Sequence, residues 1–403
     1  MDPQAQFEWL RRGAAEIVPA EDLLRKLERS ARTGTPLRVK LGLDPNVPDL
    51  HLGHAIVLRK LRQFQDLGHE AHLIIGDFTA TIGDPSGKTE TRRQLTPEEA
   101  ELNARTYAEQ YQILLDPDRT HVWFNSQWLA GMRLADVIHL TSKYTVARLL
   151  ERDDFARRMA ENRPIAVHEF LYCFCQAYDS VHLRADVELG GTDQRFNLLM
   201  ARDIQREYGQ EPQVALLTPL LVGTDGVQKM SKSLNNYIGL REPPVTIYGK
   251  VMSISDALLL PYFEYTTLVP MEEARRLVES DPWAAKRRLA REIVATYHGW
   301  SAAQEAEANW DRVHRERALP AELPEVRIPR DVVKPEGTVW IGRLLQATGL
   351  ASGTREARRL VEQGAVLVDG ERIVDPDAEI PFRVGMVAQV GRRKFVRVIG
   401  TEE

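Results

Sequence analysis

The sequence predicts an α/β protein with a doubly wound parallel sheet, followed by an α-helical region and a small α+β domain. Two observations support this prediction. Short apolar stretches alternate with amphipathic helical stretches over roughly the first 240 residues, a pattern typical of a parallel sheet covered by helices. A Pro-rich stretch, Leu319–Glu336, then separates a charged helical region from a tail with a different periodicity.

Five apolar stretches are the predicted strands of the sheet: Leu37–Leu43, Ala71–Ile75, His121–Phe124, Arg184–Leu189 and Val214–Val222. Three stretches between them have helical periodicity: His54–Leu67, Pro97–Leu115 and Asp193–Tyr208. In the first of these helices, Val57, Leu61 and Phe64 would share one face. Strands and helices at this spacing favour a parallel sheet with helices on both faces.

The same patterns predict the domain boundaries. We expect a Rossmann-like domain over residues 1–242, interrupted at about 100–180 by a mostly helical insertion. Residues 243–335 would form an α-helical domain and the linker, and residues 336–403 the small α+β domain. The elements expected in that domain are helices at Ile341–Gly349 and Thr354–Gln363 and strands at Ala365–Asp369 and Val387–Ile399.

The charge is distributed unevenly along the chain. The net charge of −5 argues against a protein that coats nucleic acid over its whole surface. Residues 340–400 differ, because they contain ten Lys or Arg and seven Asp or Glu, a net charge of +3. A basic tail on an acidic body is consistent with a local contact to a polyanion, or with an ordinary solvated surface.

Composition also bears on the compartment. No run approaches the roughly 18 apolar residues of a membrane helix, and the first residues lack the apolar core of a signal peptide. The only cysteines, Cys173 and Cys175, are too close in sequence to favour a disulfide and too few for a zinc cluster. We therefore expect two buried thiols and a cytoplasmic protein.

The first chemical motif is Leu43–Ala55, LDPNVPDLHLGHA, between a predicted strand and a predicted helix. A helix N-terminus after a parallel strand can bind an anion, because its free N–H groups and its dipole face the ligand. His51 and His54 would donate to phosphate oxygens there, and Gly53 would let a flat base lie against the backbone. Two histidines at this spacing could also bind a metal or simply lie on the surface, but no third metal ligand is evident.

The second motif is Val227–Asn236, VQKMSKSLNN, after the last predicted strand. It contains Lys229, Met230, Ser231, Lys232 and Ser233. Two ammonium groups and two hydroxyls suit a triphosphate, although a lysine-rich loop alone is usually just solvated. The combination is more specific, because an H-x-G-H and a K-M-S-K-S about 180 residues apart would both lie at carboxyl ends of parallel strands, where such sheets bind ligands.

The segment Gly83–Thr89, GDPSGKT, resembles a P-loop at first sight. Only three residues separate its two glycines, whereas a P-loop requires four, so we reject a P-loop ATPase. The segment still brings Asp84, Lys88 and Arg92 near the end of a predicted strand.

His51–His54 and Lys229–Ser233 together resemble the two signature motifs of class I aminoacyl-tRNA synthetases. Gly83–Gly87 (GDPSG), Tyr172–Asp179 (YCFCQAYD) and Gly190–Gln194 (GGTDQ) are similar, in this order, to segments of the tyrosyl-tRNA synthetases. The similarity covers essentially the whole chain, and KMSKS with the RFN after GGTDQ resembles the second bacterial branch of that family. The last 60 or so residues resemble a small RNA-binding domain shared with a ribosomal small-subunit protein.

The resemblance implies an enzyme that activates tyrosine with ATP and transfers it to tRNA(Tyr). The implied catalytic residues around the phosphates are His51, His54, Lys229 and Lys232. The other implied ATP contacts are Gly53, Lys88, Arg92, Met230, Ser231 and Ser233, with Asp193 on the ribose. The implied tyrosine contacts are Asp84, Tyr172 and Gln176 to the ammonium, Asp179 to the phenol hydroxyl and Gln194 near the carboxylate. The basic residues expected to contact tRNA are Arg355, Arg358, Arg359, Arg392, Arg393 and Lys394.

ATP would be a substrate, and Mg²⁺ would accompany its phosphates without a protein metal site of its own. The family resemblance and the apolar helical insertion also favour a homodimer. One position departs from the family pattern, because many members have a second phenol ligand, a tyrosine, where this chain has Lys40. Lys40 could pair with Asp179, or it could point away and leave Asp179 to hydrogen bonds from Tyr172 or Gln176. We favour the second arrangement, since a buried lysine is costly.

Other interpretations of the motifs stay open at this point. Tyr172, Gln176 and Asp179 are spaced like one face of an ordinary helix. A tryptophanyl-tRNA synthetase could also place an indole N–H against Asp179, although QAYD and GGTDQ resemble the tyrosyl set better. A non-catalytic RNA-binding protein on the same scaffold is a further alternative, and the two intact signature motifs argue against it.

Overall fold

The computed structural model describes residues 1–45, 50–86, 95–314, 323–391 and 394–401. Four residues with predicted phosphate or tRNA contacts lie outside the described residues: Lys88, Arg92, Arg392 and Arg393. The chain divides into two compact units, 1–304 and 305–403, and each is described by itself.

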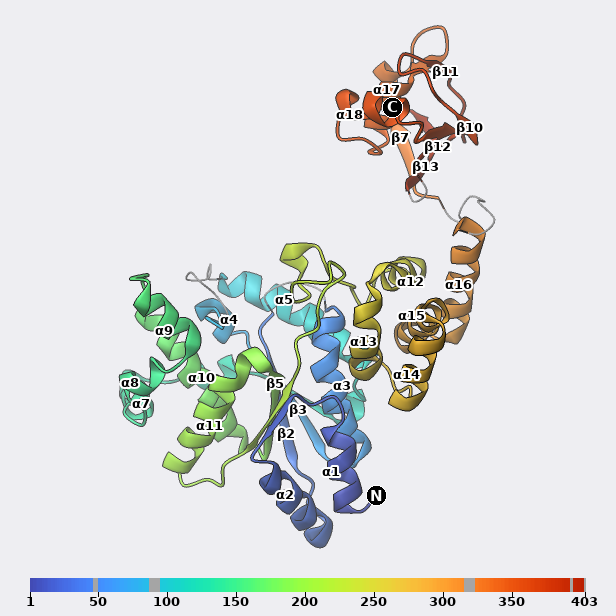
Figure 1. The fold of residues 1–403 in the computed structure, drawn as a ribbon. Helices are drawn as coiled ribbons and strands as arrows, with labels where there is room; N and C mark the ends of the chain where they lie inside the picture. The colour runs from blue at the N-terminus through green and yellow to red at the C-terminus, as the bar shows by residue number, and fades with distance from the viewer. Residues whose placement is uncertain (46–49, 87–94, 315–322, 392–393, 402–403) are drawn as a thin grey trace. The chain divides into compact units, whose positions relative to one another are not determined.

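A six-stranded sheet lies at the centre of the first unit (Figure 1). In chain order the strands are β1 (Glu16–Val18), β2 (Arg38–Leu43), β3 (Glu70–Ile75), β4 (Thr120–Phe124), β5 (Val187–Gly191) and β6 (Val214–Thr218). All neighbouring strands are parallel except β1, which pairs antiparallel with the edge of β6. The predicted doubly wound parallel sheet is therefore confirmed. Strand β1 was not predicted, because three residues are too short for a recognisable alternation.

The strand order, β1-β6-β5-β2-β3-β4, contains the feature that creates the site. From β2 the chain adds β3 and β4 in one direction, whereas β5 and β6 extend the sheet in the other direction. Connections leave β2 and β5 on opposite sides, so a crevice opens between the carboxyl ends of these two neighbouring strands. Both the H-x-G-H segment and the GGTDQ segment begin there.

Helices cover both faces of this sheet (Figure 1). Helix α3 (Leu52–Asp66) packs on one face, and α10 (Val167–Leu183) and α11 (Arg195–Glu207) pack on the other. The predicted apolar face of α3 is confirmed, since Val57, Leu61 and Phe64 are buried. Cover on both sides explains why the five residues of β6 are all buried and why the strand shows no polar alternation.

The remaining helices of this unit lie before, between and after the strands. Those before β4 are α1 (Pro3–Arg11), α2 (Ala20–Thr33), α4 (Thr79–Ile82) and α5 (Pro97–Gln110). The insertion between β4 and β5 contains α6 (Ser126–Leu129), α7 (Leu134–Thr141), α8 (Val146–Leu149), α9 (Asp153–Ala160) and α10. Residues 100–180 are thus mostly helical as predicted, although β4 interrupts them. None of the helices in the described ranges is long and apolar enough to cross a membrane.

The charged region after the sheet is helical, as expected. Its helices are α12 (Pro244–Ser253), α13 (Leu259–Thr266), α14 (Met271–Ser280), α15 (Pro282–His298) and α16 (Trp300–His314). Helix α13 packs against α3, so this region as far as residue 304 belongs to the same compact unit as the sheet. The boundaries predicted for a separate helical domain stay a prediction.

The second unit is a small α+β domain. Its strands are β7 (Glu325–Ile328), β8 (Thr338–Trp340), β9 (Val366–Val368), β10 (Glu371–Arg372), β11 (Glu379–Pro381), β12 (Val387–Val390) and β13 (Lys394–Thr401). Its helices are α17 (Ile341–Ala347) and α18 (Thr354–Glu362), close to their predicted positions. The five-stranded sheet has the order β10-β9-β12-β13-β7, and β8 pairs with β11.

Two predictions about this unit were wrong. The expected single strand Val387–Ile399 is two antiparallel strands, β12 and β13, because Gly391 adopts φ 63° between them. Part of the Pro-rich stretch expected to be a linker is β7, which pairs in parallel with β13. Its Ile328 is fully buried in the domain core, and this short apolar alternation was masked by the surrounding prolines.

Candidate active site

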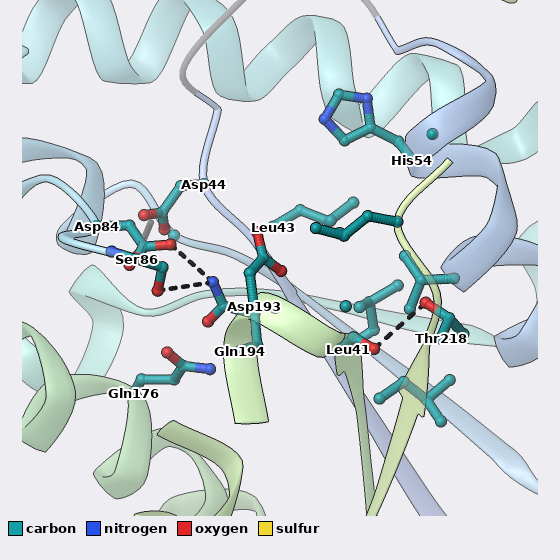
Figure 2. A pocket seen from close by; sticks show the side chains of 18 of the residues that line it. Leu41, Leu43, Asp44, His54, Asp84, Ser86, Gln176, Asp193, Gln194 and Thr218 are labelled. Atoms are coloured by element: carbon teal, nitrogen blue, oxygen red, sulfur yellow. Dashed lines mark hydrogen bonds between the residues drawn. The ribbon is translucent and has the colours of Figure 1, made fainter. Parts of the chain in front are cut away.

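A cavity of about 530 Å³ opens at the carboxyl ends of the central strands (Figure 2). Every described residue predicted to contact ATP or tyrosine lines it: His51, Gly53, His54, Asp84, Tyr172, Gln176, Asp179, Asp193, Gln194, Lys229, Met230, Ser231, Lys232 and Ser233. In Figure 2, Asp84, Gln176 and Gln194 lie together on one side and His54 lies apart on the other. The cavity therefore has two chemically distinct ends.

The two histidines form the N-terminus of α3. His51 is the N-cap residue, and its Nδ1 accepts from the Gly53 amide at 3.1 Å. The His51 amide in turn donates to His54 Nδ1 at 3.3 Å. Burial, with nearby positive charge, lowers the pKa of His51 to about 2 and the pKa of His54 to about 4. Both imidazoles are therefore neutral at pH 7 and carry their proton on Nε2, where it can donate to an anion.

The lysine loop lies after β6 and is held by Asn236. The Asn236 side chain accepts from the Ser231 amide at 2.7 Å and donates to Asp225 Oδ2 at 2.8 Å. Asn236 packs so closely to Gly223 that a Cβ there would approach its side chain to 2.3 Å. One side chain thus fixes the backbone of the loop, while the lysines themselves remain accessible.

The two lysines of this loop lie near other side chains of the site. The Lys229 side chain is 47% exposed, and its Nζ lies 3.4 Å from Asp193 Oδ2. Lys232 Nζ lies 5.6 Å from the ring centroid of Tyr237. The exposed pair of Lys229 with Asp193 contributes little stability, about 0–1 kcal/mol, so it can be exchanged for a phosphate contact.

Asp179 lies at the other end of the cavity and is almost fully buried. Its Oδ1 accepts from Trp128 Nε1 at 2.8 Å and its Oδ2 accepts from Asn125 Nδ2 at 3.3 Å. Burial raises the pKa of Asp179 to about 7, against the opposing effect of the Lys40 charge and these two hydrogen bonds. Each carboxylate oxygen retains a lone pair for a further donor.

Lys40 does not pair directly with Asp179. Its Nζ lies 2.8 Å from a Glu188 oxygen, on the neighbouring strand β5, and both side chains are about 1% exposed. It also donates to the Ser180 hydroxyl at 2.7 Å and to the Gln176 backbone oxygen at 3.0 Å, which ties β2 to α10. The arrangement we favoured is thus correct that Lys40 does not pair with Asp179, but its reason was wrong, because Lys40 is fully buried and is paired with Glu188. It was wrong about the donors to Asp179, which come from Asn125 and Trp128 and not from Tyr172 or Gln176.

Tyr172 and Gln176 line the cavity from α10. The Tyr172 hydroxyl donates to Asp44 Oδ2 at 2.9 Å, and the Thr79 hydroxyl donates to Asp44 Oδ1 at 2.7 Å. Burial and the Asp44 charge raise the pKa of Tyr172 well above its ordinary value. Gln176 Oε1 is buried and meets no hydrogen-bond donor among the described residues.

Asp84 and Gln194 are directly connected. Gln194 Nε2 donates to Asp84 Oδ2 at 2.8 Å and to the Ser86 hydroxyl at 3.1 Å (Figure 2). The Ser86 amide donates to Asp84 Oδ1 at 2.8 Å. The segment after β3 and the segment after β5 are thereby joined across the crevice.

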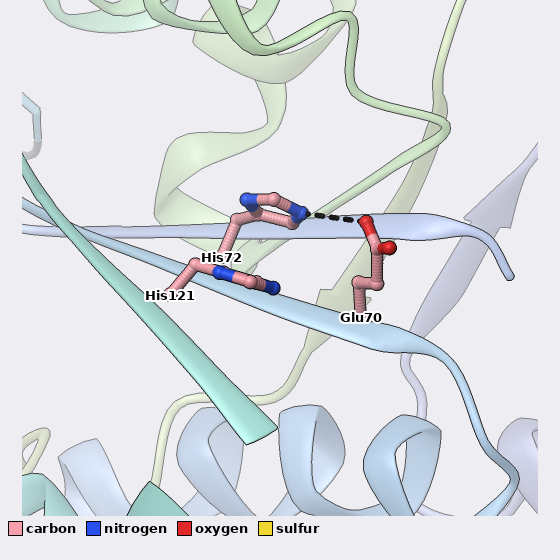
Figure 3. A group of neighbouring side chains, drawn as sticks. All are labelled: Glu70, His72 and His121. Carbon is pink, nitrogen blue, oxygen red and sulfur yellow. Dashed lines mark hydrogen bonds and ion pairs between the residues drawn. The ribbon is translucent and has the colours of Figure 1, made fainter. Parts of the chain in front are cut away.

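Glu70, His72 and His121 are a second group with metal-binding residue types (Figure 3). Their ligand atoms lie within 4.8 Å of one another, on β3 and β4. The Trp123 indole, which can only donate, gives a 3.1 Å hydrogen bond to His72 Nδ1. Neutral His72 therefore carries its proton on Nε2 and donates to Glu70 Oε2 at 3.2 Å, so that nitrogen has no lone pair for a metal.

The predicted tRNA-contacting residues that the structure describes lie in the second unit. Arg355, Arg358 and Arg359 are exposed on α18, and Lys394 begins β13. Arg358 pairs with Asp377 and lies over Trp340 at 5.3 Å from the ring centroid, whereas Arg359 lies 3.8 Å from Glu356. These surface pairs are weak and can be replaced by phosphate contacts.

The cysteines lie next to this site. Cys173 is buried, as expected, and Cys175 is only partly buried. Burial raises the pKa of the Cys173 thiol to about 11, so it stays protonated at neutral pH.

Comparisons with known proteins agree with this geometry. A family model described as tRNA synthetases class I (W and Y) matches residues 32–315, and an S4 domain model matches residues 340–381. The tyrosine–tRNA ligase of Moorella thermoacetica is 58% identical over 399 residues, 98% of this chain and 95% of the relative. That of Carboxydothermus hydrogenoformans is 54% identical, over 98% of this chain and 97% of the relative.

The chain belongs to the tyrosyl-tRNA synthetase family. The crystal structure of an Archaeoglobus fulgidus tyrosyl-tRNA synthetase complexed with L-tyrosine matches 76% of this chain and 100% of that chain. Its TM-score is 0.61 at 24% identity, which shows a shared fold. The S4 match confirms that the tail of this tyrosyl-tRNA synthetase is the small RNA-binding type of domain that its sequence resembles.

Sequence reasoning missed several residues that structure the cavity. They are Asp44, Ser86, Asn125, Trp128, Arg152 and Asn236. Asp44 and Asn125 had a usable signal, because each directly follows the last residue of a parallel strand. Trp128 and Arg152 had none, since they lie in the insertion and reach the site only through its fold.

Proposed function

We propose that this chain activates tyrosine with ATP to tyrosyl-adenylate, releases pyrophosphate, and transfers the tyrosyl group to the 3′-terminal ribose of tRNA(Tyr). The observation that carries the proposal is the two-ended cavity. A buried carboxylate and amide end suits a phenolic amino acid, and an end made of imidazoles and lysines suits a triphosphate.

Tyrosine would lie with its side chain toward Asp179. The phenol proton meets an Asp179 oxygen, while the ammonium group meets Asp84, the Tyr172 hydroxyl oxygen and Gln176 Oε1. Gln176 Oε1 supports this placement, because a buried oxygen without a donor gains most from a ligand N–H. Gln194 lies beside Asp84, near the place of the α-carboxylate.

ATP would occupy the opposite end, with the ribose at Asp193 and the phosphates at His51, His54, Lys229 and Lys232. A tyrosine carboxylate oxygen attacks the α-phosphorus, and the bond to the β-phosphate oxygen breaks, so negative charge builds up on pyrophosphate. The step needs no protein nucleophile. It needs alignment, to which the neutral histidines contribute as hydrogen-bond donors, and positive charge at the leaving group, which the lysines supply.

Mg²⁺ would enter with ATP. The groups at the phosphate end are hydrogen-bond donors and cations, which suit phosphate oxygens, so the ion would be held by the nucleotide. When bound, it would neutralise phosphate charge. The protein's own part is to orient the two substrates.

The S4 domain would bind tRNA through Arg355, Arg358, Arg359 and Lys394, together with Arg392 and Arg393. These cations would neutralise phosphates, so tRNA affinity should fall steeply as salt concentration rises. The assignment of these six residues rests on their position in the S4 unit and their charge.

The enzyme would be a cytoplasmic homodimer. Five large apolar side chains of the insertion are more than half exposed, an arrangement that favours burial by a second copy: Leu134, Ile138, Val146, Met159 and Val167. Sedimentation analysis of the chain and of a Leu134→Glu/Ile138→Glu variant tests this part. A wild-type chain that sediments as a monomer at micromolar concentration would contradict it.

The decisive experiment for the activity is ATP–pyrophosphate exchange, run separately with each amino acid. We expect exchange with tyrosine far above that with tryptophan or phenylalanine. Exchange that follows tryptophan would assign the chain to the tryptophanyl branch, and no exchange with any amino acid would favour a non-catalytic RNA-binding protein.

A further inference from the structure

Arg152 is a buried cation to which no role has been assigned. It is the N-cap residue of α9, in the helical insertion, and is 5% exposed. Its Nη2 donates to the Ser86 hydroxyl at 2.7 Å, and its Nη1 donates to Asn197 Oδ1 at 3.0 Å and to Cys173 Sγ at 3.1 Å. Its Nε donates to Asp154 Oδ1 at 2.7 Å. A residue of the insertion thus contacts the segment after β3 and the helix after β5.

Together with Ser86, Gln194 and Asn197, Arg152 closes a ring of hydrogen bonds. Asn197 Nδ2 donates to Gln194 Oε1 at 2.9 Å, and Gln194 Nε2 donates to Ser86 at 3.1 Å. Arginine can only donate, so Arg152 requires an oxygen from Asn197 and thereby sets which way that amide faces. Gln194 is then fixed at both ends, because its Nε2 also donates to the Asp84 carboxylate.

The ring determines where the Ser86 proton points. A hydroxyl has two lone pairs and one proton, and here Arg152 and Gln194 approach the oxygen as two donors. The proton must therefore turn toward a third group, which has to be an acceptor. Ser86 lines the cavity beside Gln194, and Figure 2 shows its hydroxyl on the same side as Asp84.

We propose that the Ser86 hydroxyl donates a hydrogen bond to the α-carboxylate of bound tyrosine, and that Arg152 is the positioning residue that imposes this orientation. The inference rests on the proposed placement of the tyrosine ammonium group at Asp84, since the carboxylate is attached to the same carbon. A carboxylate is an acceptor only, so it complements a donor that is already oriented.

The charges nearby are compatible with this arrangement. Arg152 Nη2 is 3.7 Å from Asp84 Oδ1, whereas its Nε is much closer to Asp154. Asp154 therefore compensates most of the guanidinium charge. Asp84 keeps its own charge for the ammonium group, and the carboxylate end of the substrate lies toward the side that holds Arg152.

Tyramine, which has the phenol and ammonium groups of tyrosine but no carboxylate, provides the test. Dissociation constants for tyrosine and tyramine are measured with the full-length wild type and with Ser86→Ala. A hydrogen bond to a charged group contributes about tenfold or more in affinity. We therefore expect Ser86→Ala to raise the dissociation constant for tyrosine by about that factor. Tyramine binding should stay within about twofold.

Arg152→Lys tests the positioning residue, because lysine keeps the charge but cannot form the same fork of hydrogen bonds. Like Ser86→Ala, Arg152→Lys should lower the affinity for tyrosine more than the affinity for tyramine. In the Ser86→Ala background it should no longer change the tyrosine-to-tyramine ratio, since both changes act on one contact. Arg158→Lys is the matched control, as Arg158 is also buried on α9 but pairs with Glu169.

The outcomes separate clearly. The proposal for Ser86 would be overturned if Ser86→Ala lowered the affinities for tyrosine and tyramine equally, or if it lowered neither affinity. If Arg152→Lys lowers both affinities equally, or if Arg158→Lys shifts the ratio as much, Arg152 is merely structural. If Arg152→Lys does not fold, the Ser86→Ala comparison still decides the proposal. A wild type that binds neither ligand would contradict the tyrosine assignment itself.

Discussion

The two ends of the cavity are built in different ways. At the tyrosine end, Asp179 and Tyr172 are buried and already hydrogen-bonded to other protein groups. At the phosphate end, Lys229 and Lys232 lie in a loop whose backbone is fixed by Asn236, and the side chain of Lys229 is 47% exposed. A preorganised buried end selects a ligand in the ground state, whereas accessible cations can tighten as charge develops. The difference implies that specificity and rate reside at opposite ends.

The largest expected effect is loss of amino-acid selectivity in Asp179→Ala. When phenylalanine binds, the buried Asp179 carboxylate has no phenol donor. The free-energy cost of leaving a buried carboxylate without a donor is larger than the net contribution of one hydrogen bond. Tyrosyl-tRNA synthetases are known to discriminate tyrosine from phenylalanine by about 10⁵. We expect most of this discrimination to disappear, measured as kcat/KM for both amino acids in the exchange assay. Undiminished selectivity would show that another group recognises the hydroxyl.

Removing the second unit should separate charging from activation. Because β7 belongs to the sheet of the second unit, the chain is best truncated after His314 and not within the Pro-rich stretch. The contacts of the second unit are linked to the contact of the tRNA 3′ end with the active site, so their loss should lower tRNA charging by about 10² at low tRNA concentration. Pyrophosphate exchange should change less than twofold. Full charging activity in the truncated enzyme would refute the role of the S4 unit.

Lys232→Ala should slow formation of tyrosyl-adenylate while hardly changing tyrosine affinity. Loss of one such electrostatic donor costs on the order of 3 kcal/mol, or about 10²-fold in rate. Lys232→Arg keeps the charge and should recover part of the rate. An unchanged activation rate in pre-steady-state kinetics of Lys232→Ala would remove the lysine from the mechanism.

The activity should depend on pH through Asp179. Its pKa is raised to about 7 in the free enzyme, so the ionised form that accepts the phenol proton is depleted as pH falls below 7. We expect kcat/KM for tyrosine to fall up to about tenfold per pH unit on the acid side. The histidines do not contribute in this range, because their pKa values are about 2 and 4. A profile that stays flat from pH 5 to 7 would contradict this assignment.

Lys40→Ala should have the smallest effect on selectivity. Lys40 pairs with Glu188 and not with Asp179, so tyrosine-to-phenylalanine discrimination should change little at a pH high enough to keep Asp179 ionised, since the Lys40 charge lowers the pKa of that carboxyl. Stability should suffer instead, since a stranded buried charge costs about 3–5 kcal/mol of unfolding free energy. Lys40→Met combined with Glu188→Leu should recover most of that loss in a denaturant titration. A loss of selectivity comparable to that of Asp179→Ala would overturn the distinction between the two residues.

The sequence predicted the sheet from local patterns, and it predicted the cavity lining from the two signature motifs and from the family resemblance. Parallel strands buried on both faces appear as apolar runs, and the signature motifs follow β2 and β6 directly. The donors to Asp179 were assigned wrongly, because Asn125 and Trp128 come from a different element and only the tertiary fold brings them to α10.

Arg152 illustrates the limit more sharply. In the sequence it stands in a run of charged residues, ERDD, which is typical of a solvated surface. In the structure it is buried between the insertion and the segment after β3, where it bonds to Ser86. Long-range contacts of this kind have no periodicity to reveal them. The same holds for β7, whose pairing with β13 joins residues far apart in the chain.

Single-turnover formation of tyrosyl-adenylate, followed as a function of tyrosine concentration, tests the separation of the two ends most directly. Wild type, Asp179→Asn and Lys232→Ala are compared in the same experiment, which gives a tyrosine dissociation constant and a rate constant for each. We predict that Asp179→Asn mainly raises the dissociation constant and that Lys232→Ala mainly lowers the rate constant. If Lys232→Ala weakens tyrosine binding as much as it slows the reaction, or if Asp179→Asn changes only the rate, specificity and rate do not reside at opposite ends of the cavity.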